Sequence, residues 1–191
     1  MGDAAGGVNV QRSYDNFDVT LASMPDLNAV IRERHARGVD WFGLTRYELR
    51  WAVPVDSRGG CRLQAAGVEL SVKVTLPRLA PGIRLSGHDD IRWRELAEHV
   101  ERHEAEHVRI ATDGAYDVLD AIRGADCKTW RARAQEAFRQ MDLRQRDFDR
   151  GDRSANRSQV ARAVEPDMRP REVRTAEEEL NGSPVEWTVG N

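Results

Sequence analysis

The sequence predicts an α+β domain in which a small antiparallel β-sheet packs on a long helix and on a second helix antiparallel to the first. Residues 46–53 and 68–76 alternate apolar and polar side chains, which is typical of half-buried strands. The turn-rich segment 56–60 lies between them and favours a hairpin. Residues 89–123 and 128–150 instead place apolar side chains at steps of three and four, which indicates two amphipathic helices. Gly124-Ala125-Asp126 separates the helices.

Weaker signals flank these elements. Residues 1–13 are rich in Gly and Ala and predict a flexible N-terminus, whereas 17–22 predict a short strand. Ser23 and Pro25 mark the start of a helix that is expected to end at Gly38. The apolar periodicity ends near Gly151, so 14–150 is expected to form the domain and 151–191 a polar, flexible tail.

Composition excludes several classes of partner. The 191 residues include 29 basic and 32 acidic side chains, a net charge of -3, so nothing favours binding to nucleic acid. No apolar run approaches the roughly 18 residues of a membrane span. The first residues do not resemble a signal peptide, which leaves either a cytoplasmic protein or an exported one lacking its signal. Cys61 and Cys127 could form one disulfide or remain two buried thiols.

The motif His103-Glu104-Ala105-Glu106-His107 lies within the first long helix. Two His residues four apart project from one face of a helix, so both imidazoles can bind a single Zn²⁺. The Glu that follows the first His can accept a proton from zinc-activated water, as a general base does. The alternative interpretation is that these are polar side chains on a helix surface. With the α+β organisation, the motif predicts a zincin-like metalloprotease.

A catalytic zinc needs a third protein ligand. The continuation H-x-x-G-x-x-H is absent, because Ile110 and Asp113 occupy the last Gly and His positions, and Asp113 points away from the site on an unbroken helix. An antiparallel second helix could supply the ligand from its end, which contains three acidic residues: Asp147, Asp149 and Asp152.

The chain also resembles a bacterial family known as predicted secreted zinc-dependent proteases, catalogued as a domain of unknown function. The matching segments are GLTRYELRW (43–51), the Cys61 segment leading to VKVTLPRL (72–79), WREL (93–96), ERHEAEHVRIA (101–111), Asp126-Cys127 and RDFDR (146–150). The resemblance implies zinc ligands at His103 and His107, a general base at Glu104, a Cys61–Cys127 disulfide, and a secreted or periplasmic location.

The chain departs from this family in two places. Glu106 stands where members have Gly, and Ser154-Ala155 replaces a His-Gly pair. We therefore expect Asp149, with Asp152 next, to act as the third ligand. The leading hypothesis is a zinc-dependent hydrolase that cleaves peptide or protein substrates. The alternative is a catalytically impaired zincin-like module that binds a protein partner, for which the tail 151–191 is a candidate docking segment.

Overall fold

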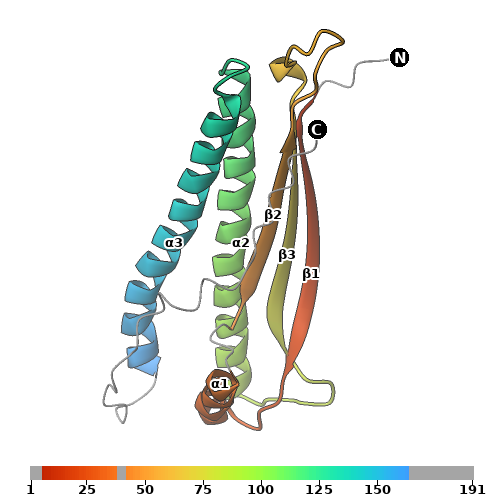
Figure 1. Cartoon of the computed structure of the whole chain (residues 1–191). Coiled ribbons are helices and arrows are strands. Elements are labelled where there is room, and N and C mark those ends of the chain that lie inside the picture. Colours follow the sequence, from red (N-terminus) through yellow and green to blue (C-terminus); the bar gives the residue numbers. More distant parts are fainter. Residues whose placement is uncertain (1–5, 38–41, 164–191) are drawn as a thin grey trace.

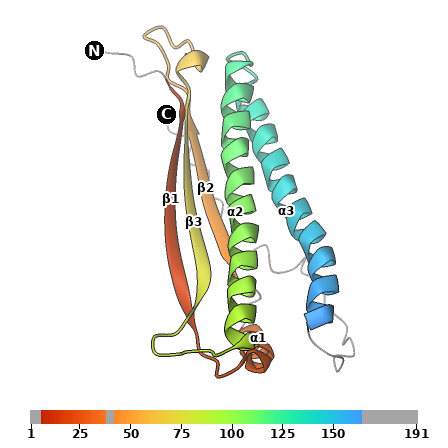
Figure 2. The same ribbon diagram turned by 180° about the vertical axis from the view of Figure 1, so that it is seen from behind.

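A computed structural model describes residues 6–37 and 42–163. Its elements in chain order are β1 (Val8–Val19), a 3-10 turn (Met24–Asp26), α1 (Leu27–Ala36), β2 (Leu44–Ala52), a second 3-10 turn (Leu63–Ala65), β3 (Gly67–Leu79), α2 (His88–Arg123) and α3 (Trp130–Ala163). The strands form one sheet in the order β1-β3-β2. Helix α2 lies along this sheet and α3 lies beside α2 (Figures 1 and 2). The predicted α+β class is confirmed.

Strands β2 and β3 form the expected antiparallel hairpin, with Leu49 opposite Leu70 and Trp51 opposite Val68. Every second side chain of β3 points toward α2 and is almost fully buried, as the alternation in the sequence predicts: Val68, Leu70, Val72 and Val74. These side chains form the main core with the buried faces of α2 and α3. The hairpin therefore fixes the sheet surface on which α2 rests.

Strand β1 differs from the prediction in two respects. It begins at Val8, so residues 8–13 are not part of a flexible N-terminus, and the strand expected at 17–22 is the end of a longer one. It also pairs with β3 in parallel, from Val8 opposite Val68 to Val19 opposite Leu79, so the sheet is mixed rather than antiparallel. The cause is tertiary: β3 supplies the backbone hydrogen bonds, and a strand with mostly exposed side chains forms without a strong local pattern.

Helix α1 is preceded by the capping that the sequence predicts. The Asp26 carboxylate accepts hydrogen bonds from the backbone N–H and the hydroxyl of Ser23, both at 2.9 Å, and Pro25 occupies the first turn. Met24 packs with Val19, Leu21 and Trp93 in a second, smaller apolar cluster near the N-terminal end of α2. The expected stop at Gly38 lies outside the described residues.

Helices α2 and α3 are 36 and 34 residues long and pack as an antiparallel hairpin (Figure 1). They approach closely at Gly114, where an added Cβ would lie 2.3 Å from Met141 Cγ. Helix α3 continues to Ala163, beyond the end expected near Arg150. The expected end marked the loss of the apolar stripe, and a helix can continue without one. The tail 164–191 is outside the described residues. No helix in the described part of the chain is long and apolar enough to cross a membrane.

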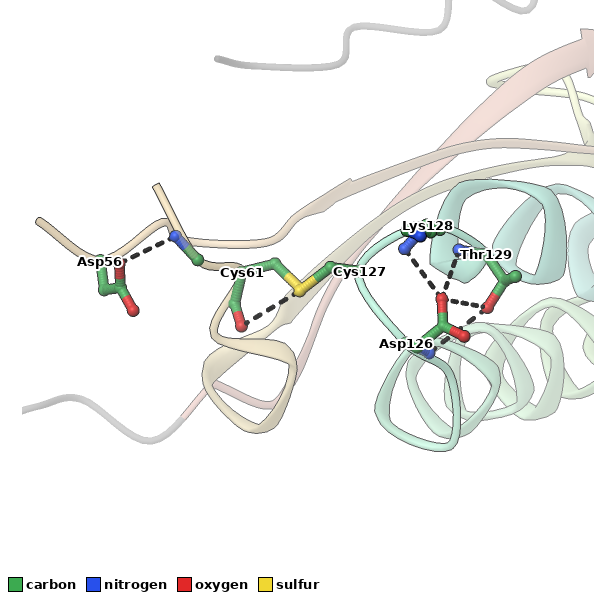
Figure 3. The surroundings of a disulfide bond; sticks show 7 residues. Asp56, Cys61, Asp126, Cys127, Lys128 and Thr129 are labelled. Atoms are coloured by element: carbon green, nitrogen blue, oxygen red, sulfur yellow. Dashed lines mark hydrogen bonds between the residues drawn. A yellow bond between two sulfur atoms is a disulfide. The ribbon is translucent and has the colours of Figure 1, made fainter. Parts of the chain in front are cut away.

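A disulfide joins Cys61, in the loop before β3, to Cys127, in the loop before α3 (Figure 3). Beside it, the Asp126 carboxylate accepts hydrogen bonds from the backbone N–H groups of Lys128 and Thr129 and shapes the approach to α3. The cysteines are 66 residues apart, and closing a loop of that length stabilises the folded state by about 4 kcal/mol in the chain-entropy description. The bridge implied by the family resemblance is therefore present, and the reading as two thiols is wrong.

Candidate metal centre

Three side chains that could hold a metal ion meet between α2 and α3. His103 and His107 come from α2 and Asp149 comes from α3, and their candidate ligand atoms all lie within 4.8 Å of one another. On each helix, two side chains of this centre are four residues apart and therefore project from the same face. The two His residues are four apart on α2, and Asp149 follows Gln145 by four residues on the face of α3 that meets them. The antiparallel packing of the hairpin thus places an acidic residue of α3 opposite the motif.

The separations of the donor atoms fit one tetrahedral cation. His107 Nε2 lies 3.1 Å from His103 Nε2 and 3.0 Å from Asp149 Oδ1, and His103 Nε2 lies 3.4 Å from the same oxygen. Ligand atoms that bind one zinc ion tetrahedrally at 2.0–2.1 Å lie roughly 3.3 Å apart. All three edges of the triangle are close to this value. Two imidazole nitrogens and one carboxylate oxygen are also a donor set that zinc accepts.

The second nitrogen of each imidazole faces a polar side chain of α3. His107 Nδ1 forms a hydrogen bond of 2.5 Å with Gln145 Oε1. His103 Nδ1 lies 3.0 Å from Asp152 Oδ2, which is within ion-pair distance but does not have the geometry of a hydrogen bond. Phe148 packs against both imidazole rings, with ring centroids 4.8 Å and 5.1 Å away. Helix α3 therefore supplies both a candidate ligand and the side chains that surround the His rings.

The charges at this centre stabilise one another. Burial raises the pKa of Asp149, but hydrogen bonds from His103 and His107 outweigh burial and lower it well below its usual value. Burial lowers the pKa of His107, but its hydrogen bonds to Asp149 and Gln145 outweigh that effect and raise it. Two imidazole nitrogens and a carboxylate oxygen point toward one another here, and a positive charge between them would stabilise the arrangement. A proton or a metal ion can supply that charge.

Glu104, the acidic residue of the motif, is only 3% exposed and lies on the side of α2 that faces β2. Its Oε2 accepts a hydrogen bond of 2.7 Å from Thr45 Oγ1 in β2. Burial raises the pKa of Glu104, while the bond from Thr45 and the charges of His107 and His103 oppose that rise. A carboxylate with a raised pKa beside a metal centre suits proton transfer near neutral pH.

Gly43 permits this burial, because a Cβ at that position would lie 2.5 Å from Glu104 Oε1 and 2.4 Å from Val100 Cγ1. We expect Gly43→Ala to displace the Glu104 carboxylate and to destabilise the fold by about 1–3 kcal/mol, as overpacking does. Thermal unfolding of the variant measures the loss of stability. Gly151→Ala in α3 is the matched control, since nothing lies within 4 Å of its added Cβ. A Gly43→Ala chain as stable as the wild type would show that this contact does not constrain the Glu104 carboxylate.

Other candidate residues from the sequence lie elsewhere. Asp113 forms an ion pair with Arg109 on the surface of α2, as expected for a residue that points away from the site. Asp147 pairs with Arg150 and is two-thirds exposed. The side chain of Glu106 accepts two hydrogen bonds from Arg109, so its charge is paired on the surface of α2. Among the described residues, only the group of His103, His107 and Asp149 has the spacing of a metal site.

Three residues of the site were not anticipated from the sequence: Gly43, Thr45 and Gln145. Gln145 carried a usable signal, because it is a polar residue at an apolar position of the helix, four residues after the buried Met141. Gly43 and Thr45 gave no such signal in the sequence. They contact residues of α2 that lie 57 to 61 positions later in the chain, and no local pattern connects residues so far apart.

Comparison with known proteins finds one family. A family model described as "Bacterial protein of unknown function (DUF922)" matches residues 14–155, which include both cysteines, the motif of α2 and Asp149. No curated protein matches the chain. No solved structure matches it either.

Proposed function

We propose a zinc-dependent peptidase activity for this chain, which belongs to the DUF922 family of bacterial proteins of unknown function. The observation that carries the proposal is the triangle of donor atoms from His103, His107 and Asp149, whose edges of 3.0–3.4 Å match one tetrahedral cation. Three protein ligands leave the fourth position of a tetrahedral ion open, as in catalytic rather than structural zinc sites.

The donor set supports zinc over other common ions. Magnesium and calcium prefer oxygen ligands, whereas two of the three donors here are imidazole nitrogens. Bound zinc would polarise a substrate carbonyl and acidify a water molecule. His103, His107 and Asp149 would hold the ion. The side chains of the two His residues are only 21% and 13% exposed, which would limit the access of water to it.

Glu104 is the proposed general base. In peptide hydrolysis the oxygen of a water molecule bonds to the carbonyl carbon, the carbon–nitrogen bond breaks, and one proton passes from the water to the leaving amine. Glu104 carries that proton: its carboxylate accepts it from the water and its carboxylic acid delivers it to the nitrogen. Thr45 donates a hydrogen bond to Oε2 and thereby fixes the orientation of the carboxyl group. The proposed substrates are therefore peptides or proteins.

Metal analysis and a hydrolysis assay test this proposal. Protein purified without added metal is expected to contain roughly one equivalent of zinc. It is expected to cleave an unfolded substrate such as casein, to lose that activity with a chelator and to regain it with zinc. Lowering the pH should release the metal, because protons compete for the His nitrogens and the Asp149 carboxylate.

Variants of two His residues control the experiment. His107→Ala should empty the site, whereas His88→Ala should retain zinc, because His88 is exposed at the start of α2. A wild-type chain that neither contains nor takes up zinc would contradict the proposal. A chain that binds zinc but cleaves no peptide would instead favour the alternative, a zincin-like module that docks a protein partner.

A further inference from the structure

Gln145 is a buried amide whose hydrogen bonds both go to one residue. It is 6% exposed, and burying an amide is costly unless its oxygen and its nitrogen are both hydrogen-bonded. Gln145 Oε1 lies 2.5 Å from His107 Nδ1, and Gln145 Nε2 donates to the backbone oxygen of His107 at 3.0 Å. The side chain of α3 thus binds the ring and the backbone of the same His at once.

These two bonds determine where the proton of the imidazole lies. The backbone oxygen of His107 can only accept, so the NH₂ group of Gln145 must face it and the amide oxygen must face Nδ1. The amide oxygen can also only accept, so Nδ1 must carry a hydrogen. A neutral imidazole carries a single N–H. His107 Nε2 faces the Asp149 carboxylate at 3.0 Å, so a metal ion at the site would replace a hydrogen on Nε2, while the bond to Gln145 keeps the hydrogen on Nδ1. The opposite orientation of the amide would bring its oxygen against the backbone oxygen, where no hydrogen is available.

We infer that Gln145 is a positioning residue that presents the Nε2 lone pair of His107 to the metal ion; this inference rests on the proposed metal site. The partner of a metal-ligating imidazole fixes its tautomer and its orientation. Gln145 does both. Its amide oxygen bonds to Nδ1 of the ring, and its amide nitrogen bonds to the His107 backbone oxygen, which holds the amide in one orientation. His103 is different, because its Nδ1 contacts Asp152 without forming a hydrogen bond. His107 is therefore the pre-oriented ligand of the pair.

Two substitutions separate positioning from packing. Gln145→Met keeps the size and burial of the side chain but removes both hydrogen bonds. Gln145→Glu keeps an oxygen that accepts from Nδ1 and loses the donor to the backbone oxygen. Gln140→Met is the matched control, because Gln140 is an exposed residue of the same helix whose side chain donates a hydrogen bond to Glu136.

The first measurement is nitrogen NMR of the neutral His107 ring in metal-free protein. The wild-type and the Gln145→Glu chains should show the hydrogen on Nδ1, whereas Gln145→Met should shift it to Nε2, where Asp149 can accept it. The second is zinc affinity by competition with a chelator. Gln145→Met should bind zinc about 10–100-fold more weakly, as loss of an outer partner does, while Gln145→Glu and Gln140→Met stay near or above the wild type.

A wild-type ring with its hydrogen on Nε2 would overturn the inference, as would unchanged zinc affinity in Gln145→Met. A wild-type chain with the hydrogen on Nδ1 and no affinity for zinc would contradict the proposed function and the role in metal binding, while the position of the proton would stand. Far-UV circular dichroism of each variant shows that the helices are intact, so a weaker affinity reports on the site.

Discussion

Glu104→Gln is expected to lower peptide hydrolysis by about 10²–10⁴-fold, the usual contribution of a positioned general base, and to leave zinc bound. Glutamine keeps the shape of the side chain and can still accept the hydrogen bond from Thr45, but its amide cannot take a proton from water. Because Glu104 is 3% exposed, replacing a buried charge with a neutral amide should not destabilise the fold. Initial rates, zinc content and thermal unfolding measure these three effects.

Glu106→Gln is the matched control. Glu106 lies two residues further along α2 and pairs with Arg109 on the surface, so its substitution should change neither zinc content nor rate. If Glu104→Gln retained wild-type hydrolysis, Glu104 could not be the base. If it lost zinc as well as activity, its carboxylate would belong to the metal's ligands.

Asp149→Ala is expected to weaken zinc binding by more than the 10–100-fold that accompanies loss of an outer partner, because it removes one of three ligands. Its Oδ1 lies 3.0 Å from His107 Nε2 and 3.4 Å from His103 Nε2, at the third corner of the donor triangle. Asp152→Ala is expected to have the smaller effect, since Asp152 contacts the opposite nitrogen of His103. Competition with a chelator measures the zinc affinity of both variants and shows which substitution weakens binding more.

Asp147→Ala serves as the control for this pair, because Asp147 lies on the exposed side of α3. Its zinc affinity should equal that of the wild type. A larger loss in Asp152→Ala than in Asp149→Ala would identify Asp152 as the ligand and Asp149 as its neighbour, which reverses the assignment made from the structure.

The sequence predicted those parts of the fold that local periodicity encodes. The alternation in β2 and β3 and the helical spacing of α2 led to the correct elements, and the position of the two His residues on one helical face followed from the spacing alone. The search for a third ligand reached the end of α3 because a short connection makes neighbouring helices antiparallel. The sequence ranked Asp149 before Asp152 as the candidate third ligand. That Asp149 lies in the donor triangle and Asp152 beside the other nitrogen of His103 depends on the rotation of α3 about its axis, which the sequence does not encode.

The errors share one physical cause. Strand β1 is held by backbone bonds to β3, a partner 60 residues later in the chain, so its own side chains gave little sign of it. The contacts of Gly43 and Thr45 with Glu104, and of Gln145 with His107, likewise depend on how distant elements dock. Local patterns predict which residues form an element, whereas these contacts are properties of the assembled layers.

The Cys61–Cys127 bridge restrains α3 at one place, and the proposed zinc ion in the donor triangle would restrain it at another. The disulfide lies in the loop before α3, whereas Asp149 lies well inside the helix. Each of the two restraints therefore acts on a different part of α3. A reductant would open the disulfide and a chelator would remove the proposed zinc ion, so each agent alone is expected to loosen only its own part of α3. A glutathione-rich interior would open the disulfide. We propose that the molecule operates outside the bacterial cytoplasm, in an oxidising environment that preserves the disulfide.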